Sequence, residues 1–262
     1  MNKYTTMDTR KLTQLTQLTQ VTQLTQLTQL FPPNIFSVVI NGQGTDIVSV
    51  TITNKTEDPV ICVKFTIRVP QGIIQLNSLL KCSDTGDDGT GTALLSKVET
   101  FANHLRITHI TLDDESNINI CGNQIDLAHF KILTTGMSWY NKHGYFSRSH
   151  EYDMKANSAF IASPIAAQLQ PEIPNTFPPT SSDETVQSYV TRIFTSIHQQ
   201  EPTCSQDDIA RGKYLYMIVN RLKGNISYNT QLTKDLEQHA GRRKLRTKRK
   251  KPNKKKRTRK HK

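Results

Sequence analysis

Hydrophobic positions between residues 35 and 82 recur at strand-like intervals, in four short runs separated by turn residues. The breaks between the runs read NGQG, NKTEDP and PQG. Short connections of this kind favour antiparallel neighbours, so this part of the chain predicts a meander. The predicted strands are Ile35–Ile40, Asp46–Thr53, Val60–Val69 and Gly72–Cys82.

The periodicity changes after Cys82, where a glycine-dense loop leads into a helical pattern. Ile107–Leu112 follows as the next strand. A strand–helix–strand crossover makes the two strands parallel, so we expect a mixed, twisted sheet of about six strands, with helix Thr92–Leu105 crossing between parallel neighbours. The apolar residues of this helix recur at spacings of three, four and seven: Leu94, Leu95, Val98, Phe101, Ala102 and Leu105.

The second half of the chain has mainly helical patterns. A helix is expected to begin near Asp126, and a short aromatic helix within Met137–Phe146 ends at Gly144 and runs into a strand. Five prolines mark Asn157–Ser182 as a linker: Pro164, Pro171, Pro174, Pro178 and Pro179. Three further helices are predicted: one beginning after a capping box formed by Ser181 and Glu184, a second over Ser205–Leu222 and a third over Thr230–Gln238.

The two ends of the chain have unusual composition. Leu12–Leu30 is a triplet repeat whose apolar positions would drift by about 60° per repeat around a helix. We expect disorder or a marginal helix up to Phe31, with self-association as the alternative. The net charge is +12, but Arg242–Lys262 holds 15 of the 34 Lys and Arg residues. The remaining 34 − 15 = 19 basic residues face 22 acidic ones, so only this tail, predicted to be disordered, is basic.

The four cysteines are widely spaced and form no CxxC pair, so reduced, structural thiols are expected and no metal site is predicted. His109, His129 and His143 have no partner in the sequence that would complete a triad or a metal site. No apolar run approaches the roughly 18 to 20 residues that a membrane span requires. The expectation is a soluble intracellular protein without a membrane partner.

Two motifs resemble those of the GNAT superfamily of acyl-CoA N-acyltransferases. Gly86-Asp87-Asp88-Gly89-Thr90-Gly91 is similar to the family's Arg/Gln-x-x-Gly-x-Gly/Ala loop, although Gly86 stands where the family has Arg or Gln. Trp139-Tyr140-Asn141-Lys142-His143-Gly144-Tyr145 resembles the family's second signature. The resemblance covers Gly72 to Ser149 and implies a GNAT-like α/β (α+β) fold, with a mixed sheet flanked by helices.

The resemblance also implies an activity, the transfer of an acetyl group from acetyl-CoA to an amine acceptor that the sequence does not identify. Tyr140 would act as the general acid, and a backbone N–H near Leu79–Lys81 would polarise the thioester carbonyl. Asp113 or Asp114 could act as a base through water, and Asp113 is the candidate that we retain. The coenzyme pyrophosphate would bind the loop residues Asp88, Gly89, Thr90, Gly91 and Thr92.

An alternative function is that of a catalytically inactive GNAT-like scaffold that binds nucleic acid or another polyanion through its tail. Clustered positive charges release counterions and bind without reading bases. The same run is equally compatible with a nuclear import signal, which makes the nucleus an alternative location. The candidate residues are Arg242, Arg243, Lys244, Arg246, Lys248, Arg249, Lys250 and Lys251.

The predicted organisation therefore has five parts. It comprises a low-complexity segment (1–33), a GNAT-like domain (34–156), a Pro-rich linker (157–182), a helical extension (183–240) and a disordered basic tail (241–262).

Overall fold

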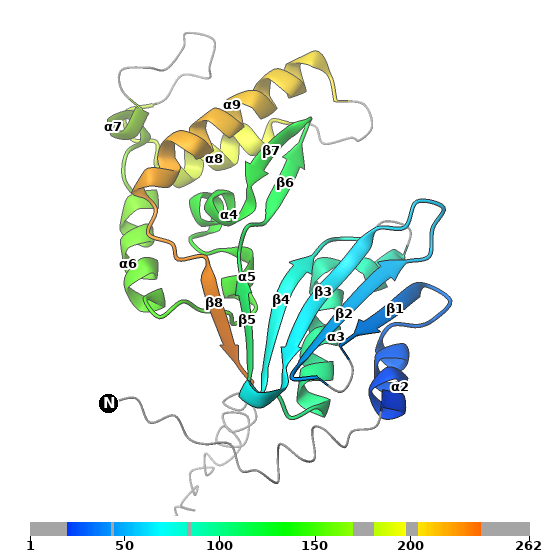
Figure 1. Ribbon diagram of the computed structural model, residues 1–262. Helices are drawn as coiled ribbons and strands as arrows, with labels where there is room; N and C mark the ends of the chain where they lie inside the picture. Colours follow the sequence, from blue (N-terminus) through cyan, green and yellow to red (C-terminus); the bar gives the residue numbers. More distant parts are fainter. Residues whose placement is uncertain (1–19, 43–44, 83–84, 170–180, 198–203, 237–262) are drawn as a thin grey trace, which may run out of the picture.

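The computed structural model describes residues 20–42, 45–82, 85–169, 181–197 and 204–236. Within these ranges the side chains bury two hydrophobic cores. One core lies under a six-stranded sheet, and the other lies among helices and a two-stranded hairpin. Figure 1 shows the two groups of elements side by side, joined through β5 (His109–Asp113) and β8 (Gln231–Asp235).

The large sheet has the strand order β1-β2-β3-β4-β5-β8. All of its neighbouring strands are antiparallel except β4 and β5, which are parallel. The expected mixed sheet with a crossover between parallel strands is therefore confirmed. Its first four strands are β1 (Phe36–Asn41), β2 (Ile47–Asn54), β3 (Ile61–Arg68) and β4 (Ile73–Leu79), with a 3-10 turn, η1 (Val69–Gln71), between the last two.

Helix α3 (Gly91–His104) makes the crossover and packs on the sheet. Its N-cap Thr90 accepts a hydrogen bond from the Ala93 N–H at 3.2 Å. Capping satisfies one of the N–H groups that a helix start leaves without a partner. The apolar face predicted for this helix is buried, including Val98 and Phe101.

A helix also forms at the end of the triplet repeat, where disorder or a marginal helix was expected. α2 (Gln20–Leu30) buries Leu27 completely, and Phe31 is buried just beyond its end. The drift of the repeat matters little over 11 residues, because Leu27, Leu30 and Phe31 share one face at spacings of three and four. Residues 1–19 lie outside the described ranges.

Two predictions about the edge of the sheet are wrong. A helix was expected over Thr230–Gln238, but this segment contains strand β8, which pairs antiparallel with β5. β8 therefore satisfies the backbone groups on the edge of β5 that does not face β4. The strand expected after the short aromatic helix is reduced to an isolated bridge between Phe146 and Thr233. The chain then continues as helix α6 (His150–Ile161).

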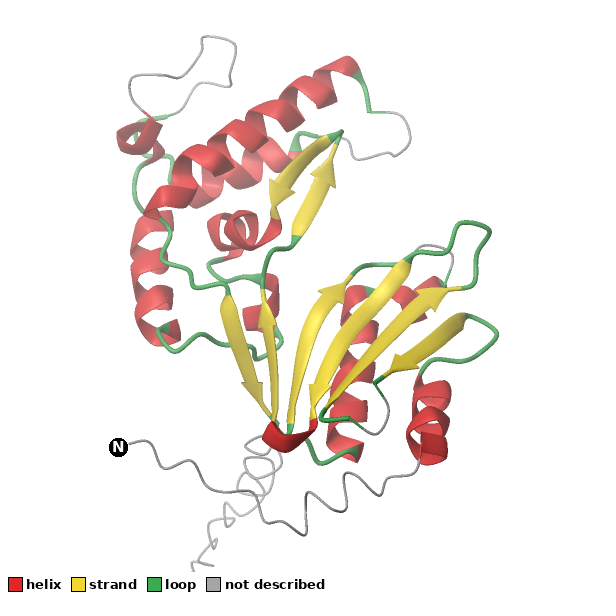
Figure 2. Cartoon of the chain, viewed as in Figure 1, coloured by secondary structure: helices red, strands yellow, loops and turns green. Residues whose placement is uncertain are grey.

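The second core is built from segments that precede and follow the short aromatic helix in the sequence. Figure 2 shows the small two-stranded hairpin among helices, apart from the large sheet. It includes residues from Ile118 to Leu133 and from Phe160 to Tyr228, so helical packing begins well before residue 183. Part of the expected linker is helical, and residues 170–180 lie outside the described ranges. The remaining elements are β6 (Asn117–Ile120), β7 (Asn123–Asp126), α4 (Leu127–Thr135), α7 (Ile165–Leu169), α8 (Val186–Thr195), α9 (Gln206–Leu222) and η3 (Lys223–Asn225).

The start of α8 differs in detail from its prediction. Thr185 is the N-cap and accepts a hydrogen bond from the Ser188 N–H at 3.2 Å. Glu184, expected in a capping box with Ser181, instead accepts hydrogen bonds from the Arg192 guanidinium. By contrast, Ser205 caps α9, which ends at Leu222 as predicted.

The cysteines form two disulfides, so the prediction of reduced thiols is wrong. Cys62 on β3 is bonded to Cys82, and Cys121 in the β6–β7 turn is bonded to Cys204 before α9. The sequence separations are 20 and 83 residues. A spacing rule based on nearby cysteines does not detect partners that only the fold brings together.

Partly buried hydrogen bonds connect the helical group to the segment that leads into β8. Asp153 on α6 accepts hydrogen bonds from the Ser227 hydroxyl at 2.6 Å and from Ser149 at 2.7 Å. Asn157 bonds the backbone of Ser227 through both ends of its amide. Burial alone would raise the pKa of Asp153, but these hydroxyl donors lower it, so the carboxylate is held in its charged form.

Candidate functional site

The two parallel strands of the sheet separate at their carboxyl ends. β4 pairs with β5 from Ile73 to Leu76, and the pairing stops there although β4 continues to Leu79. At this point a β-bulge leaves Asn77 without an opposing residue on β3. Bulges bend the strand that carries them and often lie beside binding sites. The bulge therefore marks the place where β4 diverges from β5.

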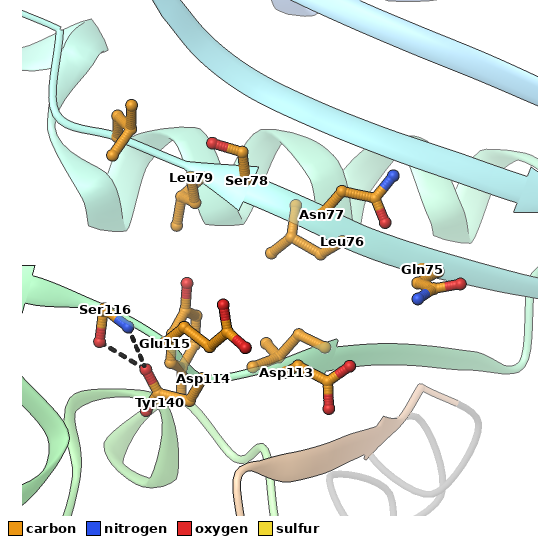
Figure 3. Close-up of a pocket in the computed structure, with 12 residues that line it drawn as sticks. Gln75, Leu76, Asn77, Ser78, Leu79, Asp113, Asp114, Glu115, Ser116 and Tyr140 are labelled. Carbon is orange, nitrogen blue, oxygen red and sulfur yellow. Dashed lines mark hydrogen bonds between the residues drawn. The ribbon is translucent and has the colours of Figure 1, made fainter.

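A cavity of about 400 Å³ opens between the diverging strands. Figure 3 shows β4 residues along one wall, with the end of β5 and Tyr140 along the other. Its volume lies within the usual range for small-molecule sites. The lining residues are Gln75, Leu76, Asn77, Ser78, Leu79, Leu80, Leu112, Asp113, Asp114, Glu115, Ser116 and Tyr140.

Tyr140 is positioned by the short helix α5 (Trp139–Lys142) and its capping box. The Ser138 hydroxyl accepts from the Asn141 N–H at 3.2 Å, and the Asn141 side chain accepts from the Ser138 N–H at 3.3 Å. Asn141 also donates to the Tyr145 carbonyl at 2.8 Å. Because both ends of this short helix are hydrogen bonded, the backbone that carries Tyr140 is fixed.

The Tyr140 side chain is only 7 % exposed, yet no described residue forms a hydrogen bond with its hydroxyl. Burial raises the pKa of Tyr140, and the negative charge of Asp114 raises it further. The hydroxyl is therefore neutral and able to donate across the physiological pH range. Tyr140 lines the cavity, and its unpaired hydroxyl can donate a hydrogen bond to a ligand atom there.

The two candidate aspartates lie in different environments. Asp113, the retained candidate for the base, is exposed at the end of β5 and lines the cavity. Asp114 is buried and accepts hydrogen bonds from the Tyr228 hydroxyl at 2.5 Å and from the Ser116 backbone N–H at 3.2 Å. The structural importance of Asp114 could not be read from the sequence, because Tyr228 lies 114 residues further along the chain.

The glycine loop lies at the N-terminus of α3 and is not part of the cavity lining. Gly89 is buried in a 3-10 turn, η2 (Gly86–Gly89), where a Cβ would come within 1.7 Å of the Thr85 hydroxyl oxygen and 2.5 Å of the Cys82 carbonyl oxygen. Only glycine fits this turn. The Asp88 carboxylate forms an ion pair with Lys97 at 2.8 Å, which reduces the negative charge at the loop.

The structure thus brings two of the sequence-predicted residues, Tyr140 and Asp113, to one cavity. The loop residues Gly91 and Thr92 begin α3, after the N-cap Thr90, and Gly91 faces the ring of Trp139. The tail residues from Arg242 to Lys251 lie outside the described ranges.

The described histidines form no catalytic set with the cavity. His109 is paired with Asp235 at 2.7 Å and His129 with Asp126 at 2.7 Å, and neither pair lines the cavity. No group of three or more metal-ligating side chains occurs among the described residues. Within the same residues, no helix has the length and apolar character needed to cross a bilayer.

Comparison of the chain with models of protein families, with curated proteins and with solved structures gave no match.

Proposed function

We propose that the protein is an N-acetyltransferase that transfers an acetyl group from acetyl-CoA to an amine in the cavity between β4 and β5. One observation carries this proposal: a cavity at the diverging carboxyl ends of two parallel strands is lined by Tyr140, a largely buried tyrosine whose hydroxyl has no hydrogen-bond partner among the described residues. Ligands of α/β sheets commonly bind beyond the carboxyl ends of parallel strands. The sequence resemblance to the GNAT superfamily is consistent with this assignment.

In the proposed reaction the amine nitrogen forms a bond to the thioester carbonyl carbon, and the bond from that carbon to sulfur breaks. The sulfur leaves as a thiolate and takes the proton of the Tyr140 hydroxyl. The raised pKa keeps this hydroxyl protonated until transfer. Enclosing the thiolate in the cavity would raise its own pKa as well, because burial penalises the charged form and so favours proton transfer.

The carbonyl oxygen needs a hydrogen-bond donor as negative charge develops on it. Backbone N–H groups near Leu79–Lys81 are the candidates. The Leu80 N–H already donates to the Cys62 carbonyl at 2.8 Å. The proposal therefore assigns this role to the N–H of Leu79 or Lys81.

The attacking amine must lose a proton, and Asp113 is the candidate acceptor. Its carboxylate lies at the exposed end of β5 and lines the cavity. A water molecule between this carboxylate and the amine would carry the proton. Return of this proton through solvent from Asp113 to the Tyr140 phenolate then restores both groups for the next turnover. Asp114 is not assigned this role, because its oxygens already accept hydrogen bonds from Tyr228 and Ser116.

The pyrophosphate of the coenzyme would lie at the start of α3, over Asp88–Thr92. A helix N-terminus offers N–H groups and a partial positive charge to an anion. The ion pair between Lys97 and Asp88 supports this placement, because it offsets one of the two aspartate charges in the loop. Binding of a polyanion through the basic tail is the alternative, and it rests on the charge of Arg242–Lys262.

Acetyl-CoA binding to the purified protein tests the proposal. A ligand that binds only the folded state at about 100 times its Kd stabilises it by about 2.7 kcal/mol. For a chain of this size the melting temperature should rise by roughly 5–10 °C. If acetyl-CoA leaves the melting temperature unchanged while a nucleic-acid duplex binds with strong salt dependence, the scaffold alternative is correct.

A further inference from the structure

The charged side chains that line the cavity are all acidic. Asp113, Asp114 and Glu115 follow one another at the end of β5, and no Lys, Arg or His is among the lining residues that the structure describes. The body of the chain carries a much smaller excess of acid, with 19 basic against 22 acidic residues outside Arg242–Lys262. Negative charge is therefore concentrated at this cavity.

The three carboxylates have different hydrogen-bonding states. The Asp114 side chain is buried, and its carboxylate accepts hydrogen bonds from Tyr228 and Ser116. Asp113 and Glu115 are exposed, and within the described ranges neither carboxylate has a hydrogen-bond or ion-pair partner. Two carboxylates without a positively charged partner that line one cavity attract a cation.

Tyr140 provides an independent indication that a ligand enters. Its hydroxyl is on a side chain more than nine-tenths buried, it has no partner among the described residues, and it lines the same cavity. The oxygen can accept a hydrogen bond from an ammonium group or donate one. Leu76, Leu79 and Leu112 supply apolar wall beside these polar groups.

We infer that the cavity binds an alkylammonium group, that is, a primary aliphatic amine in its charged form with an alkyl chain against the leucines. For its catalytic meaning the inference rests on the proposed function. It deepens that function, because it makes aliphatic amines, and not arylamines, the acceptors of the acetyl group. An arylamine is neutral at physiological pH and gains nothing from two carboxylates. A polyamine and a lysine side chain share the required chemistry.

Direct binding without coenzyme tests the inference. Calorimetry would compare 1,4-diaminobutane with its neutral analogue 1,4-butanediol, and a lysine-containing peptide with the same peptide carrying norleucine. We expect at least one cation to bind tenfold or more tightly than its neutral counterpart, and the binding to weaken with added salt. A preference for the diamine identifies a polyamine as the source, and a preference for the peptide identifies lysine.

Two matched variants locate the site. Glu115→Gln should weaken cation binding by about three- to tenfold, and adding Asp113→Asn should weaken it further, since each change removes one charge. Glu151→Gln is the control, because Glu151 is exposed on α6 and does not line the cavity. Equal binding of charged and neutral probes, or equal effects of Glu115→Gln and Glu151→Gln, would overturn the inference.

Acetyl-CoA binding, measured by melting temperature in the same variants, separates the two proposals. Cation binding that depends on Glu115 without any response to acetyl-CoA leaves the cation site standing and removes the transferase. A rise in melting temperature with acetyl-CoA, without cation binding, leaves the transferase proposal standing and removes the cation site.

Discussion

The indole ring of Trp139 lies against Gly91, with its Cζ2 atom 3.4 Å from the position that a Cβ on residue 91 would occupy. This contact joins the start of α3 to the short aromatic helix, the two segments that carry the resemblance to acyltransferases. The space beside Gly91 is therefore limited by an aromatic ring. A Cβ added at residue 91 would make ordinary van der Waals contact with the ring.

A pair of substitutions at Gly91 separates packing from coenzyme binding. Gly91→Ala should be neutral or stabilising by up to about 1 kcal/mol, because alanine is favoured over glycine in a helix. Gly91→Glu should abolish acetyl-CoA binding, because it adds bulk and negative charge where the phosphates are proposed to bind. Thermal melts with and without acetyl-CoA check both. Undiminished affinity in Gly91→Glu would refute the placement of the pyrophosphate.

Local patterns predicted most of the sheet, because its strands are close in sequence. The meander, the helix after the glycine loop and the parallel strand all depend on short connections and on clear periodicity. β8 was missed because Leu232 and Leu236 have a helical spacing of four, while its strand partner β5 is more than 100 residues away. Non-local pairing leaves no signal in a local window.

The candidate site was predictable in part for the same reason. The sequence predicts Tyr140 and Asp113 as site residues, and both line one cavity. The sequence pattern does not predict Glu115, because an exposed acid after a strand resembles an ordinary strand end. The bulge at Asn77 coincides with the point where β4 leaves β5, and no residue pattern in β4 predicts it.

The hydrogen bond between Tyr228 and Asp114 should contribute measurably to stability. Asp114→Asn, or Tyr228→Phe, should lower the free energy of unfolding by about 1–3 kcal/mol, because each leaves a buried polar group with fewer partners. Chemical denaturation of the two single variants and the double variant gives the coupling. Strictly additive effects would show that the two side chains act independently.

The disulfides predict a response to reductant. Removing the bond between Cys121 and Cys204 should cost about 2–4 kcal/mol, because it constrains a long segment of the unfolded chain. Intact-mass measurement under non-reducing conditions should show four fewer hydrogens than in the reduced protein. Four alkylatable thiols in the native, oxidised protein would contradict the pairing.

Alkaline pH should destabilise the protein through its buried tyrosines. Burial raises the pKa of five of them above the ordinary value near 10: Tyr140, Tyr145, Tyr189, Tyr214 and Tyr228. Below pH 10 both states are protonated and the full stability is present. Above it the unfolded chain ionises first, so stability falls as pH rises through the folded-state pKa values. Melting temperatures between pH 8 and 12 check this, and a flat profile above pH 10 would contradict it.

The hydroxyl of Tyr140 distinguishes catalysis from packing most directly. Tyr140→Phe removes one oxygen that forms no hydrogen bond with any described residue, so the melting temperature should change little. If the hydroxyl protonates the leaving thiolate, kcat should fall by roughly 10²- to 10⁴-fold while the affinity for acetyl-CoA is retained. The assay should use a panel of polyamine, lysine-peptide and arylamine acceptors, with melting curves recorded in parallel. Full activity in Tyr140→Phe would eliminate Tyr140 as the general acid. No other tyrosine among the described residues lines the cavity and could take over this role.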